Sequence, residues 1–151
     1  MSIEDSFLKE SFYFYENFSR FMATLFTKII NGEIPSYKVA ETELFYAFLD
    51  INPNAKGHTL CIPKREVNKI FDLDEETYLG LMQFSRRVAL AIEKVIPCER
   101  VGMSVIGLEV PHVHVHLIPL HTMDDARFTS KTHLSRDEFE TVASKIAKEF
   151  I

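Results

Sequence analysis

The chain has 151 residues, of which 46% are hydrophobic and 26% are charged, a composition typical of one globular domain and not of a disordered or low-complexity chain. Its net charge of -5 does not suit a protein that must neutralise many nucleic-acid phosphates, so we expect no nucleic-acid partner. The two cysteines form no C-x-x-C pair, and charged residues interrupt every apolar run before it could span a membrane, which together favour a cytoplasmic protein.

The first 21 residues are crowded with aromatic side chains, and we expect them to extend a single domain formed by residues 22–151. Their acidic residues, Glu4, Asp5 and Glu10, do not suit the basic start of a signal peptide, so we expect no export. Two explanations stay open. Either translation starts at Met22 and the segment is not part of the protein, or the segment is an aromatic arm that packs on a partner.

The domain begins with a predicted helix and three predicted strands. The helix runs from Thr24 to Asn31 and ends at Gly32, a residue type that tolerates the positive φ common after a helix. Residues 37–41, 44–50 and 58–62 have the composition of strands separated by polar turns. Short connections between consecutive strands predict an antiparallel meander.

The second half of the domain contains the clearest helical pattern. Apolar residues with three-four spacing over 75–96 predict a long helix with one apolar face. Residues 101–106 and 112–118 predict two more strands, and Ser135 with Glu138 forms a capping box for a last helix. The sequence therefore predicts an α+β fold in which about five antiparallel strands pack against one long helix, with short terminal helices.

A run of alternating histidine and apolar residues forms the last predicted strand. Its histidines are His112, His114 and His116, and its apolar residues are Val113, Val115 and Leu117. Because side chains alternate between the two faces of a strand, the imidazoles share one face and the apolar side chains meet the long helix. We expect the histidine face to be the more accessible one. Packing gives no reason for three histidines at this spacing, so the pattern indicates chemistry.

Two kinds of chemistry fit three aligned imidazoles. Neutral imidazoles bind metals such as zinc. Alternatively, one imidazole attacks an electrophilic phosphorus while its neighbours donate hydrogen bonds to the phosphate oxygens. The spacing of the histidines alone leaves both possibilities open.

The histidines are followed by Leu117-Ile118-Pro119, and the whole block resembles the signature of the histidine triad family of nucleotide hydrolases and transferases. Blocks in matching order at residues 26–35, 48–53 and 57–64 strengthen the resemblance. The resemblance implies a homodimer and catalysis without a cofactor. Its expected substrate is a purine nucleotide derivative similar to AMP, either a phosphoramidate or a dinucleoside polyphosphate.

The resemblance also implies a role for each histidine. His114 stands at the position of the nucleophile, which attacks the α-phosphorus and forms a covalent nucleotidyl-histidine that water then cleaves. His112 and His116 would flank the phosphate and hold its oxygens. His58 stands at the position of a fourth histidine, which fixes the tautomer of the triad.

The nucleoside is implied to bind beside these histidines. Asp50 matches the carboxylate that accepts hydrogen bonds from the ribose hydroxyls. Gly107 can bring its backbone close to a phosphate because it lacks a Cβ. The resemblance implies that four residues form apolar walls, which hold the base through buried apolar area and stacking. They are Phe26, Ile29, Ile51 and Leu60.

The chain departs from the family pattern at a structural zinc site. Many bacterial members hold zinc with two cysteines, a histidine and one triad histidine. Here Thr24 and Thr27 stand at the cysteine positions, and Glu66 or Val67 stands at the histidine position. Because such a site needs about four ligands, we expect no metal there.

The segment before the triad also differs from the family pattern. Leu108 replaces a glutamine donor, and Glu109 adds a negative charge near the expected phosphate. Glu109 either recognises a cationic leaving group or is a solvated side chain without a role. The lost donors permit a second function, a nucleotide-binding regulator with little turnover. A protein that binds a metal through the three histidines is a third.

Overall fold

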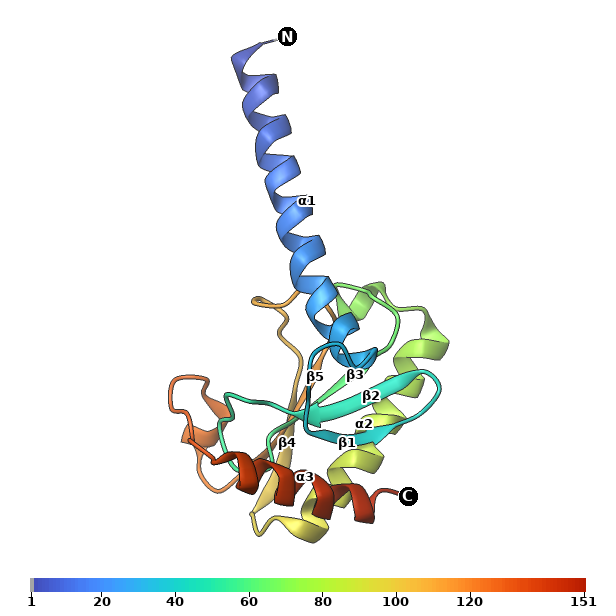
Figure 1. Cartoon of the computed structure of the whole chain (residues 1–151), viewed down its shortest axis with the longest axis vertical. Coiled ribbons are helices and arrows are strands. Elements are labelled where there is room, and N and C mark those ends of the chain that lie inside the picture. The colour runs from blue at the N-terminus through green and yellow to red at the C-terminus, as the bar shows by residue number, and fades with distance from the viewer. Residues whose placement is uncertain (1) are drawn as a thin grey trace.

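The computed structural model describes residues 2–151, with the side chains of all of them except Phe7, Phe12 and residues 14–24. Five strands form one antiparallel sheet in the order β1-β2-β3-β5-β4. They are β1 (Lys38–Glu41), β2 (Phe45–Leu49), β3 (Thr59–Pro63), β4 (Arg100–Ser104) and β5 (Val115–Leu120). The described helices are α1 (Ile3–Ile30), α2 (Glu75–Val95) and α3 (Arg136–Glu149), with short 3-10 helices at Ile70–Asp72 and Met123–Ala126 (Figure 1). The predicted α+β class and the meander of the first three strands are confirmed.

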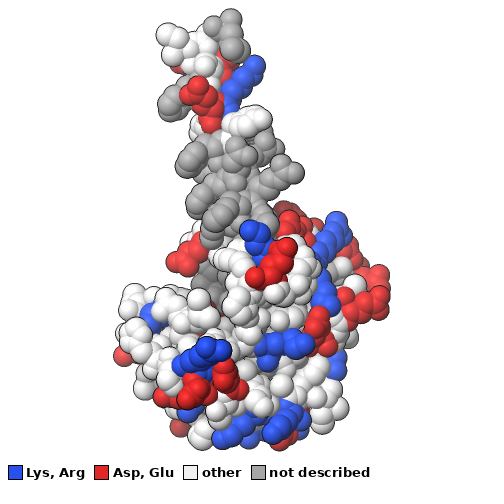
Figure 2. Space-filling model, viewed as in Figure 1, with Lys and Arg blue, Asp and Glu red and all other residues white. Residues whose placement is uncertain are grey.

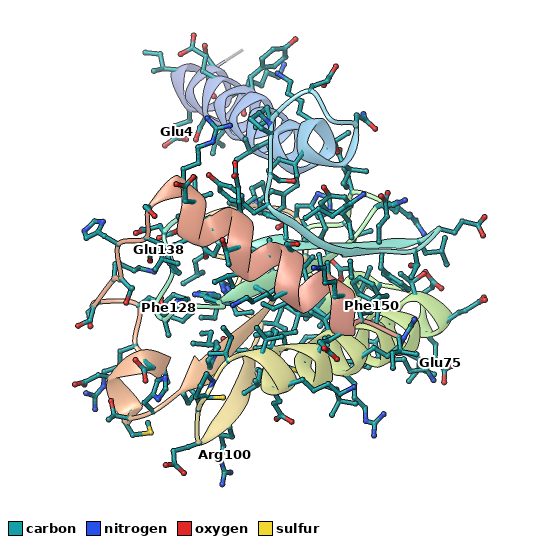
Figure 3. The ribbon with its side chains drawn as sticks, turned by 60° about the horizontal axis from the view of Figure 1, so that its bottom comes forward. Glu4, Glu75, Arg100, Phe128, Glu138 and Phe150 are labelled. Atoms are coloured by element: carbon teal, nitrogen blue, oxygen red, sulfur yellow. The ribbon has the colours of Figure 1, made fainter. Side chains whose placement is uncertain are left out.

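Helices α2 and α3 lie side by side on one face of the sheet and enclose the larger core (Figure 3). The long helix α2 buries its predicted apolar face, including Leu81, Val88 and Ile92, and α3 adds Val142 and Ile146. The apolar residues of the triad segment, Val113, Val115 and Leu117, belong to the same core, as the alternation predicts. This core supports the triad segment from the face opposite to its histidines.

The last turns of α1 cover the opposite face of the sheet. Phe26 and Ile29 pack there against Phe48, Leu60 and other sheet residues in a second, smaller core. The side chains of β2 and β3 alternate strictly between the two cores, as expected for strands buried on both faces. The smaller core therefore lies on the face that carries the triad histidines.

Helix α1 is much longer than the predicted short helix. It begins at Ile3 instead of Thr24, and its first part projects away from the rest of the molecule (Figure 1). Ser2 and Asp5 form a capping box at its start, and neither glycine nor proline occurs before Gly32. Because nothing in this sequence stops a helix, the helix continues through the whole N-terminal segment. Gly32 ends it with a φ of 77°, as predicted.

The strand that carries the triad starts later than predicted. Residues 112–114 precede β5, which begins at Val115. The proline at 111 has no backbone N–H for a sheet ladder, and the N–H of Val113 donates to the carbonyl oxygen of Val67 at 2.8 Å instead. Similarly, β4 ends at Ser104, two residues before its predicted end at Ile106. The chain between β4 and the triad is therefore loop.

The described surface carries both signs of charge. On the face drawn in Figure 2, acidic and basic side chains alternate over the globular part without an extended basic area. Among residues 2–151, no helix is both long enough and apolar enough to cross a bilayer.

Candidate functional site

A cavity of about 440 Å³ lies between the last turns of α1 and the sheet. Its walls come from α1, residues 34–36, the end of β2, β3, the loop at residues 106–110, the triad segment and the loop before α3. The predicted site residues that line it are Phe26, Ile29, Asp50, Ile51, Leu60, Gly107, His114 and His116. His58 and His112 lie behind this lining and are fully buried. One cavity therefore brings together residues from seven separate parts of the chain.

The predicted walls differ in burial. Phe26, Ile29 and Leu60 are buried, whereas Ile51 is 76% exposed and stands at the rim. Gly107 has a φ of 74° and an open space where a Cβ would be. Its conformation favours glycine, but no neighbouring atom demands it.

The histidine face is hardly more accessible than the apolar face, whose side chains are 0–1% exposed. His112 is fully buried, and His114 and His116 are each only 7% exposed. Phe26 lies edge-on to the rings of His112 and His114, with centroid distances of 5.4 and 5.6 Å. The sequence pattern of the strand does not show that α1 folds over this face.

The proton of His114 is placed by the main chain. Nδ1 of His114 lies 2.7 Å from the carbonyl oxygen of His112. A carbonyl oxygen only accepts, so Nδ1 carries the proton and Nε2 keeps its lone pair. Likewise, Nε2 of His112 lies 2.8 Å from the carbonyl oxygen of Pro63 and donates to it. The ring of His114, which lines the cavity, is thereby in the tautomer that a nucleophile at Nε2 requires.

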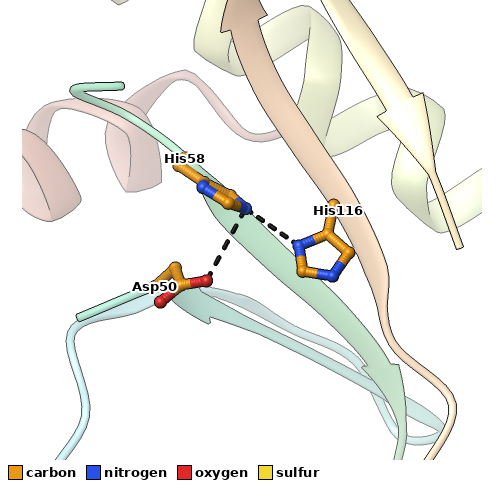
Figure 4. A group of neighbouring side chains, drawn as sticks. All are labelled: Asp50, His58 and His116. Atoms are coloured by element: carbon orange, nitrogen blue, oxygen red, sulfur yellow. Dashed lines mark hydrogen bonds and ion pairs between the residues drawn. The ribbon is translucent and has the colours of Figure 1, made fainter. Parts of the chain in front are cut away.

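Two successive hydrogen bonds determine which ring nitrogen of His116 carries the proton. The backbone N–H of Asn54 donates to Nδ1 of His58 at 3.0 Å, so the proton of His58 is on Nε2. That nitrogen lies 2.9 Å from Nδ1 of His116, which therefore accepts (Figure 4). The proton of His116 is then on its Nε2. His116 can accordingly donate a hydrogen bond from the cavity wall.

Burial keeps the imidazoles of His58 and His116 uncharged near pH 7. Burial lowers the pKa of His58 to about 3, helped by nearby His116 and by the charge of Lys131. Burial and nearby His114 lower the pKa of His116 to about 4. Burial raises the pKa of Asp50, against the opposing effect of the Asn52 N–H, which donates to its carboxylate at 2.8 Å.

Asp50, His58 and His116 also have the composition of a metal site. One ligand atom from each lies within 4.8 Å of the other two. However, Nε2 of His58 carries a proton, because its Nδ1 lone pair already accepts from Asn54. A metal needs a lone pair on that Nε2. The hydrogen-bonding pattern therefore fits a chain of neutral donors and acceptors better than it fits a metal ion.

At the positions of the family's zinc site, the hydroxyl of Thr27 donates to the carboxylate of Glu66. This contact joins α1 to the segment before α2, and Val67 accepts a backbone hydrogen bond from the triad segment. The side chain of Thr24 lies outside the described residues. The absence of zinc stays a prediction.

Phe128, Asn54 and Lys131 are among the residues at the site that were not predicted. Phe128, in the loop before α3 (Figure 3), lines the cavity with its ring 4.9 Å from that of His116. Asn54 is 4% exposed and accepts at its side-chain oxygen from Nζ of Lys131 at 2.8 Å. Phe128 and Lys131 follow the part of the chain that resembles the family, and no sequence signal marks them. Asn54 lies in a polar segment whose sequence predicts only a turn.

Comparisons with known proteins agree with the geometry. The family model for the HIT domain matches residues 31–123. Adenosine 5'-monophosphoramidase of Saccharomyces cerevisiae is 43% identical over 98 residues, which are 64% of this chain and 62% of that protein. Protein hit of Bacillus subtilis is 34% identical over 135 residues, which are 82% of this chain and 92% of that protein.

Solved structures show the same fold. A HIT-like protein involved in cell-cycle regulation from Bartonella henselae has a TM-score of 0.72 at 30% identity, covering 83% of this chain and 95% of that chain. A zinc-bound histidine triad protein from Mycobacterium smegmatis has a TM-score of 0.72 at 25% identity, covering 83% and 91%. The three histidines beside the cavity agree with these matches. The chain belongs to the histidine triad (HIT) family.

Proposed function

We propose that this chain is a nucleotide hydrolase or nucleotidyl transferase that attacks the α-phosphorus of a purine nucleoside phosphate derivative through His114. The observation that carries the proposal is the hydrogen bond from Nδ1 of His114 to the carbonyl oxygen of His112, which leaves the Nε2 lone pair for attack. Family membership and relatives named adenosine 5'-monophosphoramidase support an adenosine phosphate linkage as the substrate.

The reaction has two steps. First, Nε2 of His114 forms a bond to phosphorus and the bond from phosphorus to the leaving group breaks, while the leaving group takes a proton from solvent and Nε2–H of His116 donates a hydrogen bond to a phosphoryl oxygen. Water then attacks phosphorus and loses its proton to solvent. The bond between phosphorus and His114 breaks, releasing the nucleoside monophosphate. A phosphoramidate and a dinucleoside polyphosphate both present the phosphorus that these steps need.

The other lining residues would hold the nucleoside. The carboxylate of Asp50 is suited to accept hydrogen bonds from the two ribose hydroxyls, as one oxygen already accepts from Asn52. The apolar surfaces of Phe26, Ile29 and Leu60 would hold the base, with Ile51 at the rim. These walls provide area and few groups that read a base edge, so we propose a weak preference between purines.

A nucleotide-binding regulator with little turnover is the second candidate. It is favoured by the loop before the triad, where Leu108 is 90% exposed and offers no side-chain donor to a phosphate. Glu109 lines the same rim. Both candidates require nucleotide binding, so turnover separates them.

The test measures AMP release from adenosine 5'-phosphoramidate by the wild type, His114→Ala and the control His133→Ala, which changes an exposed histidine. We expect His114→Ala to lose about 1,000-fold or more in kcat while its AMP affinity, measured by calorimetry, changes little. Quenching with denaturant at alkaline pH, which preserves the P–N bond, followed by peptide mass spectrometry should find the nucleotidyl adduct on His114. A wild type that binds AMP without releasing it from any substrate would support the regulator instead.

A further inference from the structure

The described cavity lacks a basic side chain where the proposed substrate has negative charge. Neither lysine nor arginine occurs among the described lining residues, while Asp50 and Glu109 are both acidic. His58 and His116 are neutral near pH 7, because burial holds their pKa values at about 3 and 4. A bound phosphate therefore needs a positive charge from behind the lining.

Lys131 is the basic residue placed to supply that charge. Its Nζ lies 5.0 Å from the centroid of the Phe128 ring, whose own centroid is 4.9 Å from that of His116. Phe128 lines the cavity, so the ammonium group and His116, the expected hydrogen-bond donor to the phosphate, lie against the same ring. The charge of Lys131 also lowers the pKa values of Asp50, His58 and His116, which agrees with a position beside the whole cluster.

The position of Lys131 is built by the fold. Its Nζ donates to the side-chain oxygen of Asn54 at 2.8 Å, and the next residue, Thr132, donates its N–H to the carbonyl oxygen of Pro53 at 2.8 Å. The side-chain nitrogen of Asn54 in turn donates to the carbonyl oxygen of Asp125 at 3.0 Å. These bonds fix the loop before α3 to the loop that carries His58. The ammonium group is thereby held at a fixed place behind Phe128, from which its charge acts on the cavity.

We propose that Lys131 supplies the fixed positive charge for the phosphate groups of the substrate, and that it favours an anionic leaving group, such as an oligophosphate, over a cationic amine. This inference rests on the proposed function, since it assumes that a nucleotide occupies the cavity. It places the selection of the leaving group on the His116 side, in the loop before α3. The carboxylate of Glu109 acts in the opposite sense from the rim.

A purely structural role for Lys131 makes a different prediction. If Lys131 only held Asn54, and through it His58, its loss would weaken every ligand of the cavity equally. A charge effect instead weakens charged ligands and spares neutral ones. Lys131→Gln removes the charge but keeps an N–H donor for Asn54, and Lys131→Arg keeps both.

The experiment compares the affinities of AMP and adenosine for the wild type, Lys131→Gln, Lys131→Arg and the control Lys148→Gln, which removes an exposed charge on α3. We expect Lys131→Gln to weaken AMP binding about tenfold and adenosine binding less than about twofold. Lys131→Arg and Lys148→Gln should bind both ligands like the wild type. Equal losses for AMP and adenosine, or no loss of AMP affinity, would overturn the inference.

Turnover measurements test the proposed preference for an anionic leaving group. We expect Lys131→Gln to lower kcat/KM for a dinucleoside triphosphate about tenfold more than for a nucleoside phosphoramidate. Equal losses for both substrates would overturn that part of the inference. A wild type that binds neither AMP nor adenosine would refute the proposed function itself. A wild type that binds AMP, beside a Lys131→Gln variant that binds it equally well, would refute only the role of Lys131.

Discussion

At the scale of single residues, main-chain groups decide which ring nitrogen carries the proton on the site histidines. The carbonyl oxygens of Pro63 and His112 accept from His112 and His114, and the N–H of Asn54 donates to His58. Only the proton of His116 depends on another side chain, that of His58. Because the main chain neither ionises nor changes with most substitutions, the tautomer of His114 with its proton on Nδ1 is stable against sequence change elsewhere.

The buried neutral histidines predict a stability that falls in acid. The pKa values of His58 and His116 drop from 6.5 to about 3 and about 4 on folding, so between pH 6.5 and 4 the unfolded chain binds protons that the folded chain does not. The free energy of unfolding is therefore highest above pH 6.5. It should decrease as the pH falls, by up to about 1.4 kcal/mol per pH unit for each histidine. Urea unfolding at pH 7, 6 and 5 measures this slope.

Substitution of His58 tests the cause of that slope. His58→Gln removes one titrating group and keeps an acceptor for the Asn54 N–H, so we expect a shallower slope whatever the stability at pH 7. His133→Gln removes an exposed histidine and should keep the wild-type slope. Identical slopes in all three proteins would show that other groups cause the acid sensitivity.

At the scale of elements, α1 combines a wall of the cavity with a long projecting segment. The described α1 side chains that join the smaller core are Leu25, Phe26, Ile29 and Ile30. A chain that starts at Met22 keeps all four. We therefore expect it to remain folded, with a melting temperature within about 5 °C of the full chain, and to bind AMP with unchanged affinity. Circular dichroism and calorimetry measure these properties.

The alternative outcome would identify a role for the projecting segment. A truncated chain that precipitates or loses AMP binding would contradict the proposed boundary between residues 21 and 22. If instead only its oligomeric state changed, the segment would be an arm that packs on a partner. A control chain that starts at residue 10 lacks the capping box at Ser2 but keeps most of α1. It therefore separates the effect of helix length from the effect of the capping box.

The elements differ in how far the sequence predicts them. The long helix α2 follows from the local periodicity of its apolar residues, and the meander follows from runs of strand composition separated by polar turns. The length of α1 and the late start of β5 do not. Helix α1 continues because nothing stops it, and the triad segment bonds to Val67, which is distant in sequence. Similarly, Phe128 and Lys131 reach the site through long-range contacts that carry no local pattern.

At the scale of the whole molecule, the sheet separates a face that holds the larger core from a face that holds the cavity and the triad histidines. The core under α2 and α3 is the larger one, and the described cavity opens on the side of α1. The triad segment links the two, since its apolar residues face α2 while its histidines face α1. Changes in the larger core should therefore alter stability first and the histidine geometry only through the backbone of residues 112–116.

The two edges of the sheet differ in a way that predicts how copies of the chain associate. Edge strand β1 presents exposed Lys38 and Glu41 at its ends, and charge on an edge discourages pairing. Edge strand β4 instead has the apolar side chain of Met103, which is 49% exposed, and Ile106, just beyond it, is 50% exposed. We expect a homodimer in which this edge is covered by the same edge of a second copy.

Sedimentation measures that association directly. The wild type should sediment at twice the chain mass of 17.5 kDa, and Met103→Lys should shift it toward a single chain because each lysine would bring a charge into the apolar contact of both copies. Lys38→Gln, on the opposite edge, serves as the control and should stay dimeric. A wild type at single-chain mass would contradict the dimer, and a dimeric Met103→Lys variant would place the interface elsewhere than on β4.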